Sequence, residues 1–108
     1  PDFLALHDEL TGARIRPLVP VVVLAQAWRG GPQHQISRVL KACDILPDDR
    51  ATGRAAGVAC AASGTADVID AIVIVTAVRH QAPVVTSDPG DLTRIADSIG
   101  VKIRLFPT

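Results

Sequence analysis

The sequence predicts an α/β domain built on a mostly parallel sheet. Short apolar stretches alternate with longer helical patterns along the 108 residues. Such alternation is typical of parallel strands joined by helices. Apolar residues make up 48% of the chain, enough for one small core. No repeat, linker or low-complexity tract divides the sequence, so we expect residues 1–108 to form a single domain.

The first half of the chain is expected to hold three helices and two short strands. They are the end of an amphipathic helix at Phe3–Leu10, a strand at Ile15–Val19, helices at Val21–Trp28 and Gln33–Ala42, and a strand at Cys43–Leu46. The valines of Val21–Trp28 would also suit a strand. A preceding proline, the Gly30-Gly31 stop and the Leu24-Ala25-Gln26-Ala27 centre favour a buried helix instead.

The second half is expected to hold three helices and two strands. They are a long helix capped by Asp48 or Asp49 and ending at Ala62, a helix at Asp67–His80, a strand at Pro83–Thr86, a helix at Pro89–Ile99 and a strand at Val101–Leu105. The helix at Asp67–His80 is almost continuously apolar after Asp70, which predicts that most of its sides are buried. In parallel sheets ligands bind beyond the carboxyl ends of the strands, and Thr86 stands at such an end.

Composition narrows the possible functions. Formal net charge is zero and the sequence pI is about 7.3, so nucleic acid would have to bind a local patch. The arginines considered for that role are Arg29, Arg50, Arg54 and Arg79, although solvated helix faces explain them equally. Cys43 and Cys60 lack metal-site spacing and are expected to be free, buried thiols of a reducing compartment. No apolar run is long enough to span a membrane, so we expect a cytoplasmic protein with no membrane partner.

Two pairs of acids stand at helix starts and have two explanations. Asp67 and Asp70 have a spacing like that of a capping box, and Asp88, Pro89 and Asp91 suit the first turn of the next helix. Carboxylates that converge at the end of a sheet are also hard oxygen ligands for Mg²⁺ or Mn²⁺. Such ions can activate water for phosphodiester hydrolysis. Both explanations remain open from the residues alone.

Thr86 and Ser87, which come just before Asp88, also have both a functional and a structural explanation. Thr86 and Ser87 could orient a water molecule or the metal shell. Side chains of this kind also satisfy backbone groups in turns. The two residues are therefore accessory candidates.

Three stretches together resemble a known family. Val21–Trp28, Asp67-Val68-Ile69-Asp70-Ala71 and Val84–Leu92 are similar to the PIN domain, specifically to VapC-type toxins of bacterial toxin–antitoxin modules. The resemblance covers nearly the whole chain in element order. It implies a three-layer α/β/α sandwich and a metal-dependent endoribonuclease of a type II toxin–antitoxin system. It also implies RNA as substrate, a VapB-type antitoxin as partner and a homodimer.

The resemblance assigns roles to particular residues. Asp70 matches the family's mid-chain acid, and Asp88 matches the acid of the Thr-x-Asp turn. Both would be catalytic and hold Mg²⁺ or Mn²⁺. Asp91 matches an accessory acid and would be a further metal ligand, whereas Asp67 is closer to a helix cap.

The chain departs from the family in two places. The family opens with a strand that carries an acid, and this strand would normally be central in the sheet. Nothing here supplies it, and the chain starts at Pro1 without Met, so we expect an N-terminally incomplete domain. The family usually has Glu where this chain has Gln26, a weaker metal ligand and so only an accessory candidate. The alternative function is thus a non-catalytic PIN-like binding module with an incomplete set of acids.

Overall fold

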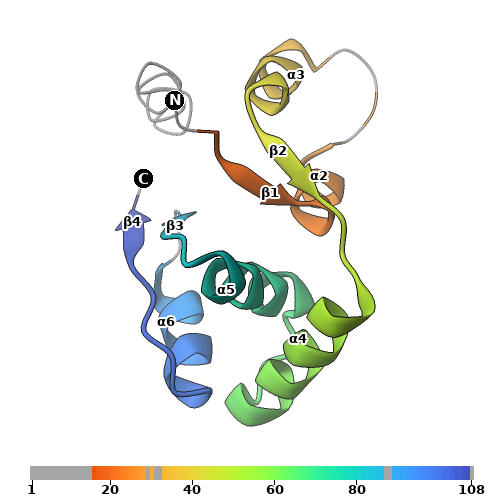
Figure 1. Cartoon of the computed structure of the whole chain (residues 1–108). Helices are drawn as coiled ribbons and strands as arrows, with labels where there is room; N and C mark the ends of the chain where they lie inside the picture. Colours follow the sequence, from red (N-terminus) through yellow and green to blue (C-terminus); the bar gives the residue numbers. More distant parts are fainter. Residues whose placement is uncertain (1–15, 29, 31–32, 87–88, 108) are drawn as a thin grey trace. The chain divides into compact units, whose positions relative to one another are not determined.

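The chain folds as a mixture of helices and short parallel strands. The computed structural model describes residues 16–28, 30, 33–86 and 89–107 (Figure 1). It contains two compact units, Pro1–Asp48 and Asp49–Thr108, called here the N-terminal and C-terminal units. The helix expected at Phe3–Leu10 lies outside the described residues. The mixed α/β class with parallel strands is confirmed, whereas the three-layer sandwich and the single domain stay predictions.

The N-terminal unit contains one parallel strand pair and two short helices. Its elements are β1 (Leu18–Pro20), α2 (Val21–Ala27), α3 (His34–Lys41) and β2 (Asp44–Leu46). Strand β1 runs parallel to β2, with Leu18 opposite Asp44. Beside this pair, the Arg16 Nε donates to Asp44 Oδ1 at 2.8 Å and its Nη2 donates to the Cys43 carbonyl at 3.1 Å. Arg16 thereby ties the chain before β1 to the start of β2.

Helix α2 confirms the helical prediction for the valine-rich segment but corrects its burial. None of its residues is fully buried. The helix has only seven residues, and it packs against β1 and β2. Strands β1 and β2 have three residues each, so they cover only part of the surface of α2. The apolar composition predicted the helix correctly and its environment wrongly.

The C-terminal unit holds the larger core. Its elements are α4 (Arg50–Ser63), α5 (Val68–His80), β3 (Val84–Thr86), α6 (Pro89–Ser98) and β4 (Leu105–Pro107). The three helices pack on one another, and α5 also contacts β3 (Figure 1). Ile74 of α5 and Ile95 of α6 are the largest fully buried side chains among the described residues. Ala59 and Ala71 are completely buried, so α4 and α5 meet through small side chains that allow a close approach.

Helix α5 is buried along most of its length, as its composition predicts. Its buried residues are Ala71, Ile72, Ile74, Val75 and Ala77. Val68 and Val78, near its two ends, are exposed. The helix is therefore enclosed at its centre and open at both ends.

Strand β4 begins later than the expected Val101–Leu105. Helix α6 is followed by Gly100 in the left-handed region, at φ 72°, and the Val101 N–H donates back to the Ala96 carbonyl. This helix-ending arrangement uses the backbone of Val101 that a strand would need. Pairing with β3 is confined to Leu105–Pro107.

The hydrogen-bond pattern shows which edge of β4 faces away from β3. The Val84 N–H donates to the Arg104 carbonyl at 2.9 Å, so the backbone of Arg104 points toward β3. Backbone groups alternate in direction along a strand, so Pro107 points to the outer edge. Proline has no N–H to offer there.

The described helices are short for a membrane span. No single one is long and apolar enough to cross a bilayer. Only the pair α4 and α5, bent by 115° at their junction, reaches the required length and composition together.

Candidate functional site

The start of α5 holds the first pair of acids. Asp67 is the N-cap, and its Oδ1 accepts the Asp70 backbone N–H at 3.0 Å. The Asp67 N–H in turn donates to Thr65 Oγ1 at 3.1 Å. Asp67 is exposed, and Asp70 is half-buried in the first helical turn. The capping explanation is therefore confirmed for Asp67.

The junction between β3 and α6 holds the second pair of acids. Thr86 is the last residue of β3, and α6 begins at Pro89. Asp91 is exposed in the first turn of α6. Ser87 and Asp88 lie outside the described residues, so the position of Asp88 stays a sequence prediction.

The described part of the chain brings some of the candidate acids onto neighbouring helices. Asp70 and Asp91 each lie in the first turn of a helix, and α5 packs against α6. Their carboxylates are the oxygen donors that Mg²⁺ and Mn²⁺ prefer. Among residues 16–28, 30, 33–86 and 89–107, no group of three or more His, Cys, Asp or Glu side chains could hold a metal ion. The donor chemistry suits the metal, and Asp88, which lies outside the described residues, would be a further donor.

Gln26 is exposed on α2, in the N-terminal unit. Its side chain is a neutral amide, so it contributes no charge toward a cation. Its predicted accessory role stays a prediction.

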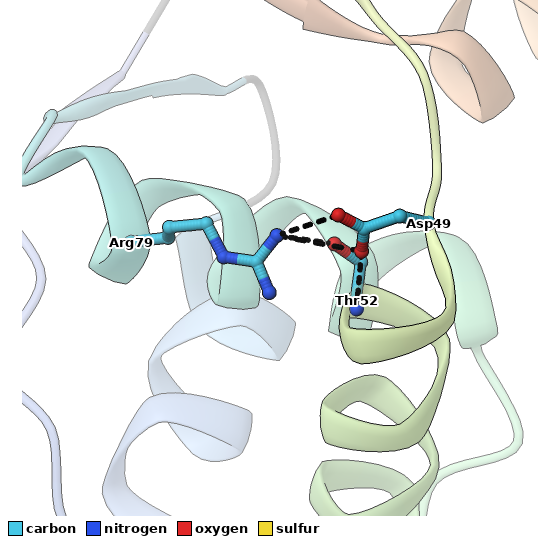
Figure 2. Close-up of polar contacts among 3 residues, drawn as sticks. All are labelled: Asp49, Thr52 and Arg79. Carbon is cyan, nitrogen blue, oxygen red and sulfur yellow. Dashed lines mark hydrogen bonds and ion pairs between the residues drawn. The ribbon is translucent and has the colours of Figure 1, made fainter.

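Of the arginines considered for binding phosphate, Arg79 already has partners within the protein. Its Nη1 donates to Thr52 Oγ1 at 2.8 Å and lies 3.4 Å from Asp49 Oδ2 (Figure 2). Arg50 and Arg54 are exposed on α4, and Arg29 lies outside the described residues. Arg79 therefore joins the end of α5 to the start of α4, and its phosphate role is disfavoured.

Two ionisable groups have perturbed pKa values for local reasons. The pKa of Asp49 is lowered, chiefly because its carboxylate accepts the Thr52 backbone N–H, and secondarily through the Thr52 hydroxyl and Arg79. Burial raises the pKa of the Cys43 thiol, with a smaller opposing effect of Arg16. The Cys43 Sγ donates to the Val39 carbonyl at 3.2 Å. Neither group lies among the predicted metal ligands.

A half-open surface depression of about 290 Å³ lies at the other end of α5, away from Asp70. It is lined by Ala77, Val78, Gln81, Ala82, Val101, Lys102, Ile103 and Arg104. Sequence reasoning missed its two cations. The signal was present, since Lys102 and Arg104 alternate with Val101 and Ile103 in a segment that was expected to be a strand.

Comparison with models of protein families, with curated proteins and with solved structures finds no match for this chain.

Proposed function

We propose that this protein is a PIN-type, metal-dependent endoribonuclease that acts as the toxin of a type II toxin–antitoxin system. Its substrate is RNA, its metal is Mg²⁺ or Mn²⁺, and its expected partner is a VapB-type antitoxin. The proposal rests on the family resemblance, on the junction of β3 with α6 and on the placement of two acids.

The junction of β3 with α6 is the observation that carries the proposal. Strand β3 pairs in parallel with β4, and α6 begins at Pro89 with Asp91 in its first turn. In parallel sheets ligands bind beyond the carboxyl ends of the strands, and this junction follows such an end. The same stretch, Val84–Leu92, carries part of the family resemblance.

Two of the candidate acids support the proposal through their carboxylate chemistry and through their positions at helix starts. Asp70 follows the N-cap of α5, and Asp91 occupies the corresponding turn of α6. The partial positive charge at each helix start favours a carboxylate there. Asp70 and Asp91 would hold the metal together with Asp88, which the sequence places at the turn between β3 and α6.

The residues have separate tasks in the proposed reaction. The bound metal would supply a polarised water and charge stabilisation for phosphodiester hydrolysis. Asp67 fixes the first turn of α5 through its bond to the Asp70 N–H, and so orients Asp70. Thr86, the last residue of β3, is the proposed accessory residue that would orient a water or the metal shell. Asp67 and Thr86 would thus be positioning residues, whereas Asp70, Asp88 and Asp91 would hold the metal.

Metal binding and RNA cleavage test the proposal in the full-length protein. Asp70→Asn and Asp88→Asn should each abolish cleavage of RNA and weaken Mn²⁺ binding measured by calorimetry. Asp97→Asn, an exposed acid in the last turn of α6, is the matched control and should change neither. Circular dichroism should show folded protein in every case. Unchanged cleavage in Asp70→Asn would contradict the proposal.

The alternative function is a PIN-like binding module without catalysis. The observation that favours it is Gln26, an exposed amide where the family usually has Glu. This alternative predicts no heat on Mn²⁺ titration and intact RNA after prolonged incubation.

A further inference from the structure

We draw no further inference here: the strongest candidate, the exposed surface of α4 that carries Gly53, Gly57 and Val58, is a helix face of small and apolar residues, and nothing in the described part of the chain shows what covers it.

Discussion

The carboxylate of Asp49 serves two structural purposes at once. It is the N-cap of α4, accepting the Thr52 N–H at 2.8 Å, and it lies beside the Arg79 guanidinium of α5 (Figure 2). The Thr52 hydroxyl also accepts from Arg79. The three side chains therefore connect the start of one helix to the end of the next.

This arrangement predicts a pH dependence of stability. The pKa of Asp49 is lower in the folded protein than its ordinary value near 3.8, because the ionised form accepts the Thr52 N–H. Its contribution is present above the unfolded pKa and is lost as pH falls through the folded pKa. Asp49→Asn should thus lower the urea midpoint at pH 7, and the difference from wild type should shrink below about pH 4.

Arg79→Met separates the causes of this effect. The Thr52 N–H bond is the largest cause of the lowered pKa, so most of the pH dependence should persist without the guanidinium. If the difference between Asp49→Asn and wild type stays constant from pH 7 to strongly acidic solution, the assignment is wrong.

Cys43 is predicted to be an unreactive thiol. It is 6% exposed, and burial raises its pKa above the ordinary value of 9.0, so less thiolate is present at any given pH. In a Cys60→Ser background, its reaction with a disulfide reagent at neutral pH should be much slower than in urea. Equal rates in folded and unfolded protein would contradict this prediction.

Helix caps could be predicted from the sequence, whereas ion pairs between distant residues could not. Caps such as Asp49 and Asp67 are local features. Each carboxylate accepts the backbone N–H of the residue three positions later, in the first turn of the helix. Ion pairs such as Arg79 with Asp49 join residues far apart in the chain, and no local pattern indicates them. The alternation of Lys102 and Arg104 with Val101 and Ile103 is visible in the sequence, whereas the depression beside them depends on residues of α5 that are distant in the chain.

At the scale of elements, two glycines of α4 should respond oppositely to alanine. Gly53 is inside the helix with open space where a Cβ would lie, so Gly53→Ala should stabilise by about 0.5–1 kcal/mol. Gly64 ends the helix at φ 72°, so Gly64→Ala should destabilise by about 1–2 kcal/mol. Urea unfolding of the two variants measures both signs. A loss of stability in both would mean that Gly53 meets a neighbour.

The packing of α5 on its neighbours gives a second prediction at this scale. Ile74 is completely buried, so Ile74→Ala should cost about 2–5 kcal/mol through weaker packing and the cavity left behind. Val58 of α4 is 67% exposed, and Val58→Ala should change the free energy of unfolding by less than about 0.5 kcal/mol. Comparable losses in the two variants, measured by urea unfolding, would contradict the described core.

The order and type of the described elements follow from the sequence, but two details do not. Alternation of apolar runs with capped helical patterns located every described helix and strand approximately. Strand β4 was misplaced because the turn at Gly100 uses the Val101 N–H, a bond that depends on how α6 ends. The exposure of α2 was missed because burial depends on what surrounds an element.

For the molecule as a whole, the two units should differ in local stability. Buried apolar residues of the described chain gather in α4, α5 and α6, whereas the N-terminal unit contributes Val39 and Cys43. Regions with little buried apolar surface open more readily. Hydrogen exchange followed by mass spectrometry should therefore show the slowest amides in α5, around Ile72–Ala77, and faster exchange in α2 and α3. Uniform protection across both units would contradict this.

The sequence did not predict which strands pair with each other. Pairing partners such as β1 with β2 are separated by two helices, and no residue pattern states which strands will be neighbours. Parallel pairing in general was predictable, because helical connections between strands require it. The candidate metal site was predictable only as a set of acids at helix starts, because the distance between such acids depends on how their helices pack.

Pro107 affects the tendency of this protein to aggregate at high concentration. An exposed strand edge is a template on which a second chain can add and begin an aggregate. Two residues of β4, Leu105 and Pro107, turn their backbone groups outward, and Pro107 has no N–H to donate there. A strand that added on the β4 side would therefore lack one hydrogen bond of its ladder.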